Sequence, residues 1–253
     1  MTDRDVVVGV DGCPAGWLAV YVPVSINGCE VDARFADAEL RLLPTFQDVL
    51  SAFARMSCVA VDIPIGLPDA VGPGGRGCDV AARKVLGARQ SAIFSMPSRD
   101  AVMCDDYRAA CQVALETSAP PRKISKQAFH LFPKIREVDA LMSANRQDCV
   151  VECHPEVAFW NLNGQVALET PKKVKSRPNP DGIAFRRMLL KSVGYTDDFL
   201  AGPGCAKSKA GEDDLLDACV NAWSASRIAA GHGIRFPDAP MTDRKGLRME
   251  IWG

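Results

Sequence analysis

The sequence has no excess of charge of either sign. Lys and Arg number 30 and Asp and Glu number 31 among 253 residues, which gives a formal net charge of −1. This balance excludes a uniformly basic protein that coats nucleic acid, and it excludes a disordered acidic tail. It does not exclude an enzyme that acts on nucleic acid, because such an enzyme can keep basic surfaces apart from an acidic metal site.

Long apolar runs and cysteine pairs of the metal-binding type are also missing. No apolar run approaches the roughly 20 residues that a helix needs to cross a bilayer, and the start, MTDRDVVVGV, has no signal-peptide pattern. None of the ten cysteines forms a Cys-x-x-Cys pair. We therefore expect a cytoplasmic protein with no membrane partner, whose cysteines are reduced and fill the core.

The hydrophobic pattern of the first sixty-odd residues predicts a β-sheet. With 47% hydrophobic and 24% charged residues, the chain has the composition of an ordinary globular protein. Apolar runs and alternating patterns predict strands over Val6–Val10, Trp17–Val24, Cys29–Phe35 and Cys58–Ile63, with an Asn27-Gly28 turn and a helix over Phe46–Met56 capped by Thr45. The predicted order is β-β-β-α-β.

Helices predominate in the rest of the chain. Residues from about 66 to 147 predict a helical insertion, with helices over 79–86 (capped by Asp79), 101–116 and 125–142, the last interrupted at Pro133. A strand at Cys149–Cys153, a helix that starts at Pro155, a basic loop over 171–181 and helices over 182–193 and 212–230 follow. We expect a single α/β domain over residues 1–253 with a mixed sheet.

The helix over 212–230 carries a polar stripe on an otherwise apolar surface. Asp214, Asp217, Asn221 and Ser224 are spaced three, four and three residues apart, so they share one face. An unpaired buried carboxylate is very costly, so this face needs cations, hydrogen bonds or water opposite it. Asp214 has an alternative role, since acids in the first turn of a helix favour its dipole. That explanation is weaker for Asp217, which lies deeper in the helix.

Two further aspartates end predicted strands. Asp11 follows Val6–Val10, and Asp62 lies near the end of Cys58–Ile63. Ligands gather at the carboxyl ends of strands in open sheets, although either aspartate could instead cap a local turn. Together with Asp214 and Asp217 they form a cluster that repels itself unless a divalent cation binds. Hard oxygen ligands favour Mg²⁺ or Mn²⁺ over Zn²⁺.

A third group is Glu152, His154 and Glu156 at the start of the helix from Pro155. Glu152 could be a further metal ligand and His154 a proton shuttle. The alternative is that His154 caps the helix and Glu156 interacts with its dipole. Zinc is disfavoured, because Cys153 and His154 have no second ligand pair at metal spacing.

Four motifs resemble the DUF429 family of uncharacterised proteins, which are predicted to be ribonuclease-H-like nucleases. They are Val8–Trp17 (VGVDGCPAGW), Val59–Pro68 (VAVDIPIGLP), Glu152–Glu156 (ECHPE) and Asp214–Ala218 (DLLDA). The resemblance runs from about Val6 to Gly231 and includes Cys78–Arg83 and Lys134–Asp139. The Asp-x-x-Asp-Ala motif is also similar to the closing motif of Holliday-junction resolvases.

The resemblance implies a ribonuclease-H-like sheet of order β-β-β-α-β-α-β-α, with the insertion between the fourth and fifth strands. It implies hydrolysis of a phosphodiester in nucleic acid or a small molecule by two Mg²⁺ or Mn²⁺ ions. Asp11, Asp62, Asp217 and Asp214 would bind the metals, and Glu152 and His154 would assist. The basic residues Arg83, Lys134, Lys172 and Lys175 would contact phosphate, unless they serve only solubility.

Two other functions stay open. The chain could be a regulatory protein that binds metal or nucleic acid without turnover, or a phosphotransferase of the actin-like or sugar-kinase-like type. The phosphotransferases need a second copy of the core and an adenosine-binding glycine motif, for which 253 residues leave little room. The sequence does not indicate whether the substrate is DNA, RNA or a small nucleotide, nor the oligomeric state.

Overall fold

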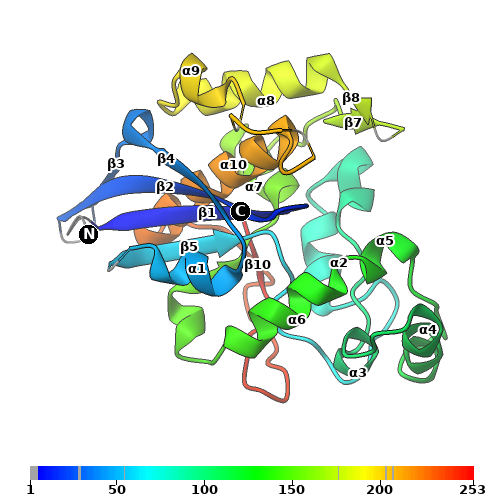
Figure 1. Ribbon diagram of the computed structural model, residues 1–253. Coiled ribbons are helices and arrows are strands. Elements are labelled where there is room, and N and C mark those ends of the chain that lie inside the picture. The colour runs from blue at the N-terminus through cyan, green and yellow to red at the C-terminus, as the bar shows by residue number, and fades with distance from the viewer. Residues whose placement is uncertain (1–4, 28–29, 54, 176, 203, 207) are drawn as a thin grey trace.

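The chain folds around one mixed sheet, which the computed structural model shows in Figure 1. Described are residues 5–27, 30–53, 55–175, 177–202, 204–206 and 208–253. The strands of this sheet are β1 (Val6–Cys13), β2 (Gly16–Asn27), β3 (Glu30–Ala33), β4 (Glu39–Leu43), β5 (Met56–Val61) and β6 (Val150–Glu152). Their order is β3-β2-β1-β5-β6, and β4 also pairs with β2. β1 is antiparallel to β2 and parallel to β5, and β5 is parallel to β6.

β1, β2, β5 and β6 confirm four of the predicted strands, but the structure differs at the predicted third strand. The sequence predicts one strand over Cys29–Phe35, whereas β3 ends at Ala33 and the 3₁₀ helix η1 (Phe35–Asp37) leads into β4. β3 pairs with the end of β2 and β4 with its beginning, so both lie along one edge of β2. β4 is only partly buried, which explains its weak signal. Gly28 of the predicted turn and Cys29 lie outside the described residues.

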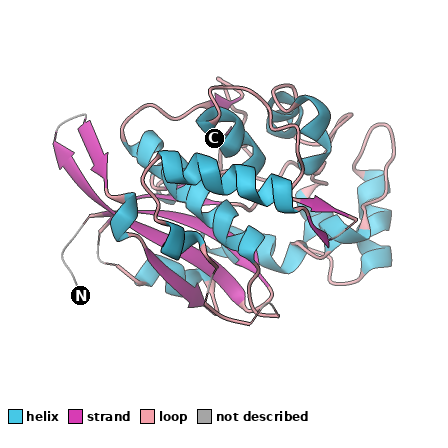
Figure 2. Ribbon diagram, turned by 90° about the horizontal axis from the view of Figure 1, so that it is seen from above, coloured by secondary structure: helices cyan, strands magenta, loops and turns pink. Residues whose placement is uncertain are grey.

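Helices cover both faces of the sheet. α1 (Phe46–Ser51) and α6 (Phe132–Leu141) lie on one face, over Val6, Val8 and Val10. α10 (Glu212–Ala229) crosses β1, β2 and β5 on the other face. α7 (Pro155–Leu162), α8 (Pro180–Ser192) and α9 (Asp197–Leu200) precede α10 in the chain and pack with it in one apolar cluster, in which α8 lies on the outer side of α10 (Figure 2). The predicted helix over Phe46–Met56 is too long, since Met56 begins β5.

The segment between β5 and β6 is helical, as predicted. It contains α2 (Gly77–Arg83), η2 (Gly87–Ala92), α3 (Arg99–Val102), α4 (Tyr107–Glu116), α5 (Lys126–Phe129), α6 and η3 (Arg146–Asp148). Asp79 does not cap α2 as predicted. The N-cap is Arg76, and Asp79 accepts a hydrogen bond from its backbone N–H. Pro133 lies in the first turn of α6, where a missing N–H is tolerated.

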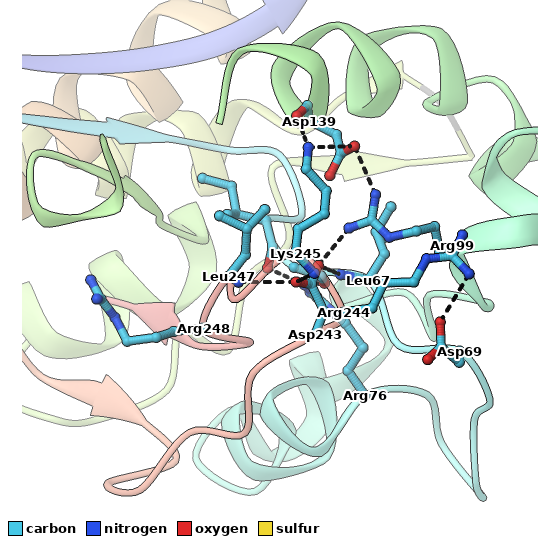
Figure 3. A network of polar contacts seen from close by, with 12 residues as sticks. Leu67, Asp69, Arg76, Arg99, Asp139, Asp243, Arg244, Lys245, Leu247 and Arg248 are labelled. Carbon is cyan, nitrogen blue, oxygen red and sulfur yellow. Dashed lines mark hydrogen bonds and ion pairs between the residues drawn. The ribbon is translucent and has the colours of Figure 1, made fainter. Parts of the chain in front are cut away.

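The C-terminal residues return across the inserted helices. β9 (Arg235–Phe236) pairs with β10 (Ile251–Trp252), and the short β7 (Lys173–Val174) and β8 (Arg177–Pro178) pair within the predicted basic loop. Arg99 bridges Asp139 at 2.7 Å and Asp243 at 2.5 Å, which joins the returning segment to the insertion (Figure 3). The cysteines of the described ranges form no disulfide. None of the helices described combines the length and apolar character needed to cross a bilayer.

Candidate functional site

The ends of β1 and β5 bring Asp11 and Asp62 to one edge of the sheet. The two strands run parallel, with Val10 opposite Val61. Asp11 is the next residue of β1, and the backbone N–H of Asp62 donates to the carbonyl of Val10 at 3.0 Å. The two carboxylates therefore belong to neighbouring residues at the ends of adjacent parallel strands.

Gly9 and Asn221 bring α10 directly onto β1. A Cβ on Gly9 would lie 2.0 Å from the carbonyl oxygen of Ala218 and 2.0 Å from the backbone nitrogen of Ala222. Only a residue without a side chain allows this approach. The side chain of Asn221 donates to the carbonyl of Val10 at 3.1 Å. The predicted stripe of α10 therefore faces the end of β1 that carries Asp11.

The four predicted carboxylates influence one another's protonation. Burial raises the pKa of Asp11 well above its ordinary value, and the charges of Asp217, Asp62 and Asp214 raise it further. Burial also raises the pKa of Asp62 to about 6, although His154 lowers it. The pKa of Asp214 is likewise raised by burial, against a hydrogen bond from the backbone of Gly211. The charges of the other three predicted aspartates thus act on Asp11; we refer to Asp11, Asp62, Asp214 and Asp217 as the acidic cluster.

Lys172 neutralises part of the acidic cluster. It lies between α7 and α8, and its ammonium donates to Oδ2 of Asp217. Burial lowers the pKa of Lys172, but the charges of Asp217 and Asp11 raise it more, so the net shift is upward. Oδ1 of Asp217 is buried and has no hydrogen-bond partner within the described ranges. The sequence predicts Lys172 as a phosphate ligand, whereas here it is bound to a carboxylate.

The donor chemistry of the acidic cluster fits a divalent cation, because carboxylate oxygens are the ligands that Mg²⁺ and Mn²⁺ prefer. The free Oδ1 of Asp217 leaves one buried oxygen available for such an ion. As placed, no three His, Cys, Asp or Glu side chains of the described residues gather closely enough to hold a metal ion. A bound ion therefore requires side chains of the acidic cluster to move closer together, beside the ammonium of Lys172 on Oδ2 of Asp217.

A cavity of about 220 Å³ opens beside the acidic cluster. Asp11 and Asp62 line one part of it, and Lys134, His130 and His154 line another. The apolar wall comes from the insertion, from Ile93, Phe94, Met96 and Leu131. We call this the site cavity. Two of the three histidines of the chain thus face the same space as the carboxylates.

His130 is a site residue that sequence reasoning missed. It is exposed, it follows the short α5, and it has no motif around it that would single it out. His154 is the N-cap of α7, and its Nδ1 accepts a hydrogen bond from the backbone of Glu156 at 3.2 Å. The cap role and the position on the site cavity are compatible, since Nε2 lies 3.3 Å from the carbonyl of Ala92.

Glu152 is occupied by a buried ion pair. Its carboxylate accepts from Arg76 at 2.6 Å and from the backbone of Ile65 at 2.7 Å. Burial raises its pKa to about 7, while Arg76 lowers it. Glu156 in turn accepts from the buried Arg186 at 2.6 Å. Both acids therefore form ion pairs with arginines of this chain. The sequence did not reveal the pair of Glu152, because Arg76 lies in a glycine-rich loop without a periodic pattern.

The other three predicted phosphate ligands lie in different surroundings. Lys134 lines the site cavity, where it donates to the carbonyl of Gly16 at 2.5 Å and lies 4.3 Å from the centre of the Trp17 ring. Arg83 instead donates to the carbonyls of Ile93 and Gly74, so it braces two loops of the insertion. Lys175 is exposed in the turn between β7 and β8.

Comparison with known proteins identifies a family. Residues 9–242 match the family model described as "Protein of unknown function (DUF429)". This match contains β1 from Gly9 onward, the whole insertion and α10. Searches of the curated proteins and of the solved structures found no match.

Proposed function

The chain belongs to the DUF429 family, and from the acidic cluster beside the site cavity we propose that it is a divalent-metal-dependent phosphodiester hydrolase, most specifically a nuclease. The observation that carries the proposal is the position of Asp11, Asp62, Asp214 and Asp217 around the same end of β1, where burial raises the pKa of each and the charges of neighbouring acids raise it further. Such self-repelling clusters at strand ends are typical of metal-assisted hydrolysis.

The topology supports a ribonuclease-H-like assignment. Strands β1, β2 and the β3–β4 edge precede α1 and β5, which corresponds to the predicted order β-β-β-α-β. The carboxylates lie at the end of β1, directly after β5, and on the last long helix. These are the positions that the resemblance assigns to the acidic residues of that fold.

Asp11 and Asp217 would hold the Mg²⁺ or Mn²⁺ ions, and Asp62 and Asp214 would complete their coordination. When bound, the ions supply a water molecule of lowered pKa and charge stabilisation at the leaving oxygen. Lys134 and His130 also line the site cavity. There they would orient an anionic phosphodiester at the carboxylates.

A cleavage screen tests the proposal. The purified chain is incubated with single-stranded, double-stranded and branched DNA, with RNA, and with bis(p-nitrophenyl) phosphate, in Mg²⁺, Mn²⁺ or EDTA. We expect metal-dependent cleavage that falls by about 100-fold or more in Asp11→Asn and Asp217→Asn, as for the loss of a principal electrostatic group. Asp213→Asn is the matched control, because Asp213 is the neighbouring acid of α10 and pairs with Lys173. Equal cleavage by wild type and Asp217→Asn would overturn the assignment.

One observation favours a second function. The Lys172–Asp217 pair neutralises the deepest carboxylate of the acidic cluster without a metal, as a regulatory protein that has no turnover would allow. Calorimetric binding of Mn²⁺ or of an oligonucleotide, without cleavage of any substrate in the screen, would support this binding function instead.

A further inference from the structure

A second cavity adjoins the site cavity. It has a volume of about 280 Å³ and shares Phe94 and Met96 with the site cavity. All of its lining residues belong to the insertion between β5 and β6. We call it the side cavity. Its volume is at the lower end of the range of about 300–1,000 Å³ for small-molecule sites, so it suits one small planar group rather than a folded segment.

The inner wall of the side cavity is apolar and contains an aromatic ring. Met96, Ala114, Ile124 and Ala128 are buried residues that line it. Phe94 is only partly buried, packs with its inner side against the main apolar core, and forms no contact with another aromatic ring of the described residues. A partly buried aromatic ring in an apolar recess is suited to stack on a nucleobase.

The rim of the side cavity is positively charged. Arg122 and Lys123 are exposed on it, and neither side chain forms an ion pair with any residue that the structure describes. The polar residues Ser95, Ser118 and Ser125 also line the side cavity. Unpaired cations beside an aromatic recess are the combination that binds the phosphate and base of a nucleotide.

The recess is held open by contacts within the insertion. Arg83 donates to the carbonyl of Gly74 at 2.5 Å and to the hydroxyl of Ser95 at 3.0 Å, and both of these residues line the side cavity. The backbone of Val71 pairs with Thr117 and Ala119. Arg83 therefore positions the recess rather than contacting phosphate itself.

We propose that the side cavity binds one nucleotide unit of the substrate, with its base against Phe94 and its phosphate at Arg122 and Lys123. This proposal rests on the proposed phosphodiesterase function, since it names the substrate as one that carries bases. The shared residues Phe94 and Met96 place this unit next to the phosphodiester in the site cavity. The insertion then selects nucleotide substrates, while the sheet supplies the acidic cluster.

Binding is measured by calorimetry and by saturation-transfer NMR in EDTA, so that no turnover is needed. The probes are AMP, adenosine, ribose 5-phosphate, and five-nucleotide DNA and RNA oligomers. We expect AMP to bind more tightly than adenosine or ribose 5-phosphate, with base protons saturated. If an oligomer binds more tightly than AMP, the bound nucleotide unit belongs to a nucleic acid. If the oligomers and AMP bind with equal affinity, the ligand is a free nucleotide.

Two variants and a matched control test the lining. Arg122→Glu with Lys123→Glu should weaken AMP binding by about tenfold or more, because phosphate contacts are electrostatic. Phe94→Leu should weaken it by about tenfold through lost stacking. Arg108→Glu with Lys84→Glu reverses the same charge at exposed positions of the insertion outside the cavity, and should change affinity by less than about threefold by screening.

The outcomes separate the two proposals. No binding of AMP or of either oligomer, or equal affinity in wild type and both lining variants, overturns the nucleotide site even if cleavage is observed. Lining-dependent binding without any metal-dependent cleavage keeps the nucleotide site and overturns the hydrolase function. Circular dichroism of each variant shows that lost binding is not lost folding.

Discussion

Arg76 forms a buried ion pair with Glu152, in which Nη2 lies 2.6 Å from Oε1. The same guanidinium group contacts Asp79 at 2.7 Å. Arg76 belongs to the insertion and Glu152 to β6, so the pair joins the insertion to the sheet beside the site cavity. Glu152, which the sequence predicts to be catalytic, thus binds a cation of the insertion in the lining of the site cavity.

We expect Glu152→Gln to destabilise the fold. Removing one partner of a buried ion pair typically costs about 3–5 kcal/mol, because the other charge stays buried. Urea unfolding measures the change, and Asp197→Asn in the exposed pair with Lys191 is the control, for which a loss below about 1 kcal/mol is expected. A variant with unchanged stability and abolished cleavage would contradict this structural role and support the predicted catalytic role of Glu152.

Lys172→Met should increase the affinity for Mn²⁺. Removing the ammonium frees Oδ2 of Asp217 and removes a positive charge that repels a divalent cation at the acidic cluster. We expect a gain of about tenfold, which corresponds to about 1.4 kcal/mol, in a calorimetric titration. Lys173→Met is the control, since Lys173 is the next residue along the chain and pairs with Asp213 of α10 at 2.5 Å. Equal Mn²⁺ affinity in the two variants would contradict the effect of Lys172 on metal binding.

Gly9→Ala should be among the most destabilising single-methyl additions in the sheet. The new Cβ would meet backbone atoms of Ala218 and Ala222 at 2.0 Å, so α10 would have to move away from β1. Overpacking of this kind costs about 1–3 kcal/mol or more. Gly77→Ala is the control, because nothing lies within 4 Å of its added Cβ. If urea unfolding shows both variants to be equally stable, the close approach of α10 is wrong.

Asp243 should contribute to the loss of stability in acid. Burial opposes its charge, but hydrogen bonds from the backbone of Leu67 and Leu247 and from Arg99 outweigh burial, so its pKa lies below the ordinary value. Ionised Asp243 therefore stabilises the fold fully above the unfolded-state pKa of about 3.9. That contribution is lost as the pH falls below this value through the folded-state pKa.

The measurement compares the free energy of unfolding at neutral pH with that near pH 3. We expect Asp243→Asn to be less stable than wild type at neutral pH and to lose less stability on acidification. Asp69→Asn, in an exposed pair with Arg244, should follow the wild-type curve. Parallel curves for wild type and Asp243→Asn would contradict the role of the carboxylate.

The parts of the fold that the sequence predicts are those with strong periodicity. β1, β2, β5 and α10 are apolar runs, and the charges of Asp62, Asp214 and Asp217 act on Asp11 at the end of β1. β4 is a short, partly buried edge strand, so it has no such pattern. Its pairing is decided by the length of β2, which extends beyond β3.

The parts of the site that the sequence does not predict depend on contacts between distant segments. Lys172 reaches Asp217 from a loop 45 positions earlier, and Arg76 reaches Glu152 across 76 positions. His130 enters the site cavity only because the insertion folds back on the sheet. No spacing rule connects such residues, and each is an ordinary polar residue when taken alone.

The bridge made by Arg99 also bears on the order in which the chain folds. Its two carboxylate partners lie 40 and 144 positions later, so Asp139 leaves the ribosome long before Asp243. Domains fold during synthesis as their segments emerge, and distant contacts form slowly. The insertion therefore waits for the last segment of the chain before its buried arginine is fully neutralised. The same last segment carries Met249 and Ile251, which pack against Cys78, Ala82 and Leu86 of the insertion, so until it emerges the growing chain leaves this apolar cluster incomplete.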